Sequence, residues 1–333
     1  MPRLALSAVP PEQADADLLV LPVAAGAGGP VAPAVTAKVL ERLRTDLESV
    51  PRWIGGTDRF TGKLDDALAL PGYGAVAAPA VLLVGVGPDA DRTPETLRRA
   101  AAVAVAAAGK AATMAVALHR CDPPAADEAL AAVAEGVALA AYRFQRHKST
   151  PDPGLEAVTL LVDGDRSLAA AEPALRRAEV AARATLLARD LVNEPASRIN
   201  PATLAAEAVR LARAAGLEHQ VLTGPALRRG RFGAVQAVGG GSATGPRLVE
   251  LRYRPAGAAR HVALVGKGVT FDSGGIDLKR GAGMDGMKDD MAGAAAVLAA
   301  VVAAAELALP TAVTAILPLV ENMPGGSAMR PGD

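Results

Sequence analysis

The stretch VGKGVTFDSGGIDLKRGAGMDGMKDD, residues 265–290, places glycine-rich turns, lysines and carboxylates between an apolar run and an alanine-rich segment. The apolar run is His261–Val265, which is typical of a strand, and the alanine-rich segment predicts a helix over 289–307. In open α/β sheets, ligands bind beyond the carboxyl ends of the strands. The stretch therefore predicts an α/β fold in which a functional loop lies between a strand and a helix.

Four side chains in this stretch are candidates for a metal-dependent site. Asp272 follows the apolar run, and Asp290 lies 18 residues later at the predicted start of the helix, where the helix dipole favours a carboxylate. These two carboxylates could converge on one divalent cation, with Lys267 as a third ligand if the cation displaces its proton. Lys279 could remain charged and polarise a substrate carbonyl, or stabilise the oxyanion that forms from it.

Each candidate also has a plain structural interpretation. Asp272 fits a turn residue, and Asp289-Asp290 fits an exposed pair at a helix start. Three of the seven lysines fall within 267–288, and chance clustering with one helix-start lysine could produce this. Histidines are not usefully placed, because the four of them are scattered, there is no H-E-x-x-H, and His261 is expected at a strand end.

The length of 333 residues predicts two domains, because one hydrophobic core rarely grows beyond about 250–300 residues. Short apolar runs alternate with helical segments in both halves of the chain. This alternation predicts an α/β fold in each domain, with a mostly parallel or mixed sheet flanked by helices. We predict an N-terminal α/β domain over 1–165, a linking helix over 166–192 and a second domain over 193–333.

The same patterns predict the individual elements. The predicted strands are 18–21, 81–87, 113–118, 157–162, 218–222, 247–253, 261–265 and 312–317. The predicted helices are 36–50, 94–108, 125–142, 167–191, 201–215 and 289–307, with Thr93 and Asn200 as N-caps followed by proline. The final segment, 321–333, is predicted to be loop.

The composition is that of a globular protein, with 51% hydrophobic and 21% charged residues. Formal net charge is zero, so neither nucleic acid nor an anionic membrane is indicated as a partner. Cys121 is the only cysteine, which excludes a disulfide framework and a thiolate metal site. No apolar run reaches the ~20 residues of a spanning helix, and the N-terminus does not resemble a signal peptide. We therefore expect a soluble, cytoplasmic protein.

Gly85-Val86-Gly87 follows a predicted strand and raises the alternative of a nucleotide-binding enzyme. The dinucleotide fingerprint needs a third glycine three residues later, where this chain has Ala90. Pro88-Asp89 follows directly, and its negative charge is unfavourable for a phosphate. A plain turn between a strand and a helix is the favoured interpretation.

Several blocks of this chain, all beyond about residue 188, closely resemble the leucyl aminopeptidase (cytosol aminopeptidase) family. They are DLVNEP at 190–195, GKGVTFDSGG at 266–275, Leu278-Lys279, GMD at 283–285, MKDDMAGAA at 287–295, ENMPGG at 321–326 and RPGD at 330–333. Residues 1–165 are similar to the family only as an α/β N-terminal domain, without a diagnostic motif.

The resemblance implies an enzyme that removes N-terminal residues from peptides, using two divalent metal ions such as zinc, manganese or magnesium. It implies that Lys267 and Asp290 are metal ligands, that Asp272 bridges both metals, and that Lys279 is the catalytic lysine. Members of the family commonly form hexamers through their catalytic domains. The substrate pocket would draw on Met284 and Asn322.

The family pattern contains one further block, N-T-D-A-E-G-R, which lies beyond RPGD and completes the two metal sites. This block does not occur in residues 1–333. We therefore expect residues 193–333 to be the N-terminal part of an incomplete catalytic domain, with at most one partial metal site and little or no activity. The alternative is a non-catalytic binding or assembly protein on an aminopeptidase scaffold.

Overall fold

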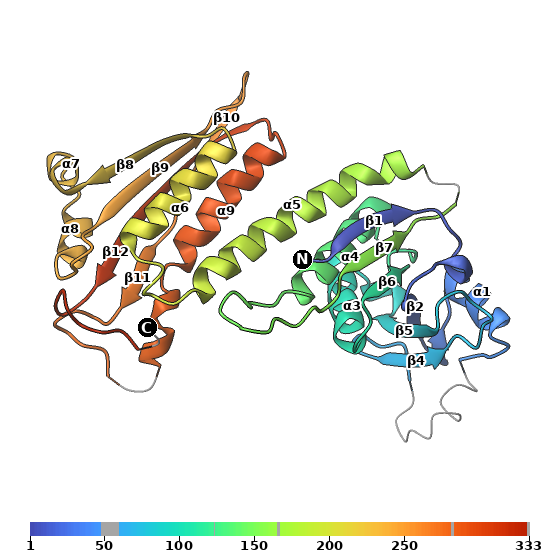
Figure 1. The fold of residues 1–333 in the computed structure, drawn as a ribbon. Coiled ribbons are helices and arrows are strands. Elements are labelled where there is room, and N and C mark those ends of the chain that lie inside the picture. The colour runs from blue at the N-terminus through green and yellow to red at the C-terminus, as the bar shows by residue number, and fades with distance from the viewer. Residues whose placement is uncertain (48–59, 123, 165–166, 281–282, 332–333) are drawn as a thin grey trace. The chain divides into compact units, whose positions relative to one another are not determined.

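The computed structural model describes residues 1–47, 60–122, 124–164, 167–280 and 283–331. The chain divides into two compact units, Met1–Ala182 and Arg183–Asp333. Each unit has one sheet flanked by helices (Figure 1). This architecture confirms the α/β fold expected for both halves of the chain. The predicted linking helix falls on helix α5, Leu168–Asn193, and the division between the units lies within this helix.

Within its described residues, the first unit has a seven-stranded sheet with the order β1-β7-β6-β2-β5-β4, and β3 pairs with β2. Its strands are β1 (Arg3–Ser7), β2 (Leu18–Gly26), β3 (Gly29–Val31), β4 (Ala67–Pro71), β5 (Ala80–Gly87), β6 (Thr113–Val116) and β7 (Ala157–Leu161). Neighbours from β1 to β5 run parallel, whereas β3 and β4 are antiparallel additions. The sheet is therefore mostly parallel, as expected.

Helices cover both faces of this sheet, which explains why its central strands are apolar on both sides. Val20 packs in a core with helices α3 (Pro94–Ala107) and α4 (Ala126–Ala140), whereas Leu19 packs in a second core with helix α1 (Ala34–Arg42). Short 3-10 turns, η1 (Pro11–Gln13) and η2 (Asp89–Asp91), join some of the elements. The predicted N-cap Thr93 is confirmed, and it forms a capping box with Thr96.

The second unit has a mixed sheet in which a long strand, β12 (Thr311–Asn322), lies at the centre. The other strands are β8 (Glu218–Thr223), β9 (Arg247–Tyr253), β10 (Arg260–Val265) and β11 (Gly268–Asp272). β10 and β11 pair with successive parts of the same edge of β12 and run parallel to it, whereas β9 is antiparallel on the other edge. The strand β11 thus reaches the end of β12, where the candidate residues lie.

The helices of the second unit pack against this sheet, and one of them begins beside the candidate residues. They are α6 (Pro201–Ala214), α7 (Gly224–Arg229), α8 (Gly233–Gly239) and α9 (Ala292–Glu306), together with the 3-10 turn η3 (Met284–Asp289). Helices α6 and α9 pack on one face of the sheet, where Val313, Ala315 and Leu317 of β12 enter their common core. The predicted N-cap Asn200 of α6 is confirmed, and it accepts hydrogen bonds from the first turn.

The structure corrects four predicted elements. The helix predicted over 36–50 is α1, which ends at Arg42, and residues 48–50 lie outside the described residues. The helix predicted from 289 begins at Ala292. Residues 268–272 are a strand rather than part of a turn, because they pair with the extended end of β12. That extension also places Glu321 and Asn322 in β12 rather than in a loop.

Packing explains why residue 85 is a glycine, so no nucleotide-binding role is needed to explain it. A Cβ atom at Gly85 would lie 1.8 Å from the carbonyl oxygen of Lys63, so only glycine fits between β5 and the preceding loop. Within the described residues, no helix is long and apolar enough to cross a membrane.

We expect Gly136→Ala to lower the free energy of unfolding by about 1–3 kcal/mol, because the added methyl overpacks the α3–α4 contact. A Cβ atom at Gly136 would lie 2.4 Å from the carbonyl oxygen of Arg98 and 2.8 Å from Cβ of Ala101. The better helix propensity of alanine, about 1 kcal/mol, offsets only part of this cost. Urea denaturation followed by circular dichroism measures the change. The control is Gly28→Ala, which meets no atom within 4 Å; equal destabilisation of both variants would contradict the packing argument.

Candidate active site

Two glycines allow the residue between them to approach helix α9 closely. A Cβ atom at Gly266 would lie 2.4 Å from the carbonyl oxygen of Gly293, and one at Gly268 would lie 2.5 Å from a methyl of Leu319. The Lys267 carbonyl accepts a hydrogen bond of 2.8 Å from the amide of Ala294 in the first turn of α9. The backbone contact therefore brings the Lys267 side chain to the start of this helix.

The Lys267 ammonium lies 2.6 Å from Oδ2 of Asp290. Asp290 stands just outside the helix, since Met291 is the N-cap and Ala292 the first helical residue. Asp290 Oδ2 is buried and accepts no hydrogen bond from the described residues, so the nearby ammonium contacts it as an ion pair only. The first predicted pair of ligands is thus assembled.

Asp272 is the last residue of β11, and each of its carboxylate oxygens has different partners. Oδ1 accepts hydrogen bonds from the amide of Gly274, at 3.0 Å, and from Nδ2 of Asn322, at 2.7 Å. Oδ2 lies 2.7 Å from the ammonium nitrogen of Lys279. Only 15% of the Asp272 side chain is exposed, so these contacts replace most of its hydration.

A glycine turn returns the chain from β11 so that Lys279 faces Asp272. Gly274 and Gly275 have φ angles of +92° and +69°, which glycine adopts without strain. The turn is closed by a hydrogen bond of 2.9 Å from the amide of Lys279 to the carbonyl of Ser273. The Gly-Gly pair therefore determines where the candidate catalytic lysine lies.

The four predicted residues thus form two lysine–carboxylate pairs, Lys267 with Asp290 and Lys279 with Asp272. The hydrogen bond that the Lys279 ammonium donates to Asp272 raises the pKa of Lys279, and the charges of Asp290 and Asp289 add to this effect. The second pair therefore lies within the electrostatic field of the first. Burial opposes ionisation of Asp272, but hydrogen bonds from Lys279, Asn322 and Gly274 outweigh it and lower the pKa of this carboxyl.

Lys288 supports the site from a neighbouring position. Its ammonium donates a hydrogen bond of 2.6 Å to the carbonyl oxygen of Asn193, at the C-terminus of α5, and lies 3.5 Å from that of Glu194. The DLVNEP block and the MKDDM block are therefore joined directly, although they are far apart in the sequence. Cations are favoured at helix C-termini because the last carbonyls have no partner within the helix.

Sequence reasoning did not find two features of the site. Asn322 was expected to line a substrate pocket, and its hydrogen bond to Asp272, which its side-chain amide donates, was not predicted. The sulfur of Met287 lies 3.2 Å from the Lys279 ammonium, and Met287 packs with Met284 against a small buried cluster of Ala196, Phe271 and Met323. The predicted strand ended at residue 317. The alternation of strand side chains could have placed Asn322 beside Asp272 only if that strand had been predicted to continue to residue 322.

The donor atoms fit a divalent cation. The described residues contain no group of three or more His, Cys, Asp or Glu side chains that could hold a metal. The expected donors are instead the carboxylates of Asp272 and Asp290 and the amine of Lys267, which would have to lose its proton. Hard oxygen donors with one nitrogen suit several divalent ions. The buried Asp290 Oδ2 has the Lys267 ammonium as its charged partner at 2.6 Å, so a cation would bind there in place of the Lys267 proton.

Comparisons with known proteins agree with this architecture. The model of the cytosol aminopeptidase family N-terminal domain matches residues 34–151, and that of the catalytic domain matches residues 186–333. A probable cytosol aminopeptidase of Micrococcus luteus is 42% identical over 99% of this chain and 64% of its own length. One of Streptomyces coelicolor is 42% identical over 100% of this chain and 67% of its own length. The chain thus spans about two thirds of the length of these relatives.

Solved structures of similar sequence have the same fold. The bottromycin maturation enzyme BotP in complex with Mn has a TM-score of 0.76 and is 39% identical, over 96% of this chain and 62% of that one. A mutant of tomato leucine aminopeptidase has a TM-score of 0.82 and is 28% identical, over 100% of this chain and 65% of that one. The fold and the family models assign the chain to a family of peptidases. The chain belongs to the cytosol aminopeptidase family.

In the metal-free protein, Lys279→Met should raise the pKa of Asp272, because the substitution removes a hydrogen bond and a charge that lower it. The folded-state pKa of Asp272 lies below its ordinary value of 3.8. The pair therefore stabilises the fold above that value, and the contribution is lost as the pH falls through the lowered pKa. An acid titration of the side-chain carboxyl by ¹³C NMR measures the shift.

Lys110→Met is the matched control for this titration, because it removes the same charge from the first unit. An Asp272 pKa that is the same in both variants would show that the Lys279 contact does not form in solution.

Proposed function

We propose that the catalytic centre built on this chain is that of a metal-dependent aminopeptidase, which releases N-terminal amino acids, leucine-type residues among them, from peptides. The observation that carries the proposal is the pairing of Lys267 with Asp290 and of Lys279 with Asp272 at the junction of β11 and α9. Membership of the cytosol aminopeptidase family supports the same conclusion.

Lys267, Asp272 and Asp290 are the proposed metal ligands. A bound divalent cation would supply Lewis acidity toward the scissile carbonyl and toward an attacking water. Manganese is the favoured ion, because the related enzyme BotP was solved in complex with Mn; zinc is the second choice. We propose that the chain provides at most one partial site, because the three proposed donors are too few to hold two ions.

Lys279 is the proposed catalytic residue. Its raised pKa, which results mainly from the hydrogen bond with Asp272, keeps the ammonium charged at neutral pH. A charged ammonium in this position can polarise a peptide carbonyl and stabilise the oxyanion that develops on it. The sulfur of Met287 lies 3.2 Å from this ammonium, so an apolar substrate side chain would find an apolar neighbour beside the reacting group.

The remaining parts of the proposal follow from the family resemblance. Peptides would be the substrates, the complete protein would be cytoplasmic, and its catalytic domains would assemble as a homo-hexamer. Residues 1–333 alone are proposed to have little or no activity, because a two-metal clamp needs donors beyond Lys267, Asp272 and Asp290.

A chimera tests the proposed activity. It joins residues 1–333 to the C-terminal part of the Micrococcus luteus relative that this chain does not span. We expect the chimera to hydrolyse leucine p-nitroanilide with Mn²⁺, whereas residues 1–333 alone show little or no turnover. Lys279→Met in the chimera should lower kcat by roughly 10²–10³-fold, because it removes an oxyanion-stabilising charge.

Lys110→Met in the chimera is the charge-matched control and should retain full activity. A folded chimera that binds Mn²⁺ but hydrolyses no aminoacyl substrate would overturn the proposed function. Full activity of Lys279→Met would overturn the role given to that lysine alone.

Metal binding can be measured on the 333-residue chain itself. Isothermal titration with Mn²⁺ should give a stoichiometry of at most one ion per chain, and Asp290→Asn should abolish binding because it removes a ligand. Asp289→Asn is the matched control, since it removes the same charge one residue away and should leave binding intact. Loss of binding in both variants, or in neither, would contradict the assignment of Asp290 as the ligand.

A further inference from the structure

The two oxygens of the Asp272 carboxylate have separate functions in this structure. Oδ1 accepts two hydrogen bonds, from the amide of Gly274 and from the side chain of Asn322, at 3.0 and 2.7 Å. Oδ2 contacts only the Lys279 ammonium among the described residues. An oxygen with two N–H donors is largely satisfied, so Oδ2 is the oxygen left for a cation.

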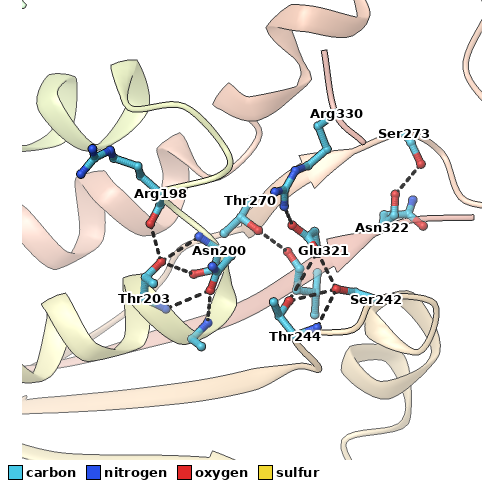
Figure 2. Close-up of polar contacts among 12 residues, drawn as sticks. Arg198, Asn200, Thr203, Ser242, Thr244, Thr270, Ser273, Glu321, Asn322 and Arg330 are labelled. Carbon is cyan, nitrogen blue, oxygen red and sulfur yellow. Dashed lines mark hydrogen bonds and ion pairs between the residues drawn. The ribbon is translucent and has the colours of Figure 1, made fainter. Parts of the chain in front are cut away.

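Asn322 is itself held in one orientation. Its backbone carbonyl accepts hydrogen bonds from the amide and the hydroxyl of Ser273, at 3.0 and 2.6 Å, and Figure 2 shows the hydroxyl contact. A Cβ atom at Gly275 would lie 2.8 Å from Oδ1 of Asn322, so the absence of a side chain at Gly275 leaves room for the amide in this position. The carboxylate of Asp272 accepts hydrogen bonds but cannot donate them, and therefore Nδ2 must be the atom that faces it.

The end of β12 is also fixed through the residue that precedes Asn322. Glu321 is only 4% exposed, and its carboxylate accepts hydrogen bonds from the hydroxyls of Ser242 and Thr244 and pairs with Arg330 (Figure 2). Successive strand side chains point to opposite faces, so Glu321 and Asn322 anchor the strand on both sides. A buried carboxylate with all these partners resists displacement, because moving it would leave charges unpaired.

We propose that Asn322 is a positioning residue, which holds Asp272 so that Oδ2 faces Lys279 and the proposed cation. The inference rests on the proposed metal site, because the carboxylate is positioned for that site. Partners beyond the direct ligands orient ligating side chains and commonly contribute about 10–100-fold to metal affinity. Asn322 is such a partner, and the contacts of Glu321 and Ser273 hold the backbone of Asn322 in place at the end of β12.

The test is Mn²⁺ binding to the 333-residue chain with Asn322→Leu and Asn322→Ala. Both variants remove the N–H donor, and the leucine keeps the approximate shape. We expect each to bind Mn²⁺ about 10–100-fold more weakly than the unaltered chain, and the EPR spectrum of the bound Mn²⁺ to change with the ligand arrangement. Thermal unfolding without metal, followed by circular dichroism, shows whether each variant folds.

Thr270→Val is the matched control. Thr270 lies on β11 and donates a hydrogen bond of 3.3 Å to the carbonyl of Val320, so the variant also removes one hydrogen bond between β11 and β12. It leaves Asp272 untouched, and we expect unchanged Mn²⁺ affinity and an unchanged EPR spectrum even if unfolding occurs at a lower temperature. If the role of Asn322 were purely structural, the Asn322 variants would also keep the Mn²⁺ affinity and the EPR spectrum of the unaltered chain and would only unfold at a lower temperature.

Two results would overturn the inference in distinguishable ways. If the unaltered chain binds Mn²⁺ and Asp272→Asn does not, but a folded Asn322 variant binds as tightly as the unaltered chain, the positioning role is wrong and the proposed metal site stands. If the unaltered chain binds no Mn²⁺, the proposed metal site fails and the inference fails with it.

Discussion

The close backbone contact between the start of β11 and the first turn of α9 determines the geometry of the candidate site. Gly266 and Gly293 leave no room for a side chain at their contact, and the Lys267 carbonyl bonds to the amide of Ala294. Because of this contact, a lysine on one segment meets Asp290 on another, although 23 positions separate them in the chain (290 − 267). Without two glycines, the strand and the helix would separate and the first ion pair could not form.

Charge balance is the second constraint on the site. Two ammonium groups face two carboxylates, and the carboxylates of Asp272 and Asp290 are largely withdrawn from water, whereas both lysine side chains are exposed. Each carboxylate therefore depends on its partner, because desolvation disfavours an unpaired ion. A cation that replaced the proton of Lys267 would keep a positive charge close to Asp290. The same carboxylates can therefore serve a protein without metal and a protein with metal.

Much of the fold could be predicted because it depends on local patterns. The apolar run 81–87 and the proline-capped helices at Pro94 and Pro201 have strong signals in the nearby sequence, and the structure has the expected elements. The strand β11 was not predicted, because glycine turns lie on both sides of its five residues and the segment was interpreted as part of them. Only its pairing with β12 shows the strand. The start of α9 was placed too early, since residues 284–289 form a 3-10 turn before the helix.

The candidate site divides in the same way. Lys267, Asp272, Lys279 and Asp290 were predicted from their chemistry and from the family motifs, whereas the particular pairing of lysines with carboxylates depends on the tertiary fold. The role of Asn322 could not be read, because its contact with Asp272 joins positions 50 residues apart. Hydrogen bonds between distant segments leave no periodic signal in a single sequence.

The bond between Lys288 and the end of α5 has a consequence for the order in which this chain folds. The carbonyl of Asn193 accepts a hydrogen bond from an ammonium 95 residues later, so this contact of the helix terminus depends on a distant segment. Closing so long a loop costs entropy before the contact gives any return. The last turn of α5 and the loop that carries Lys288 should therefore become ordered in the same late event, so that the helix end acquires its final stability only when the lysine–carboxylate site takes shape.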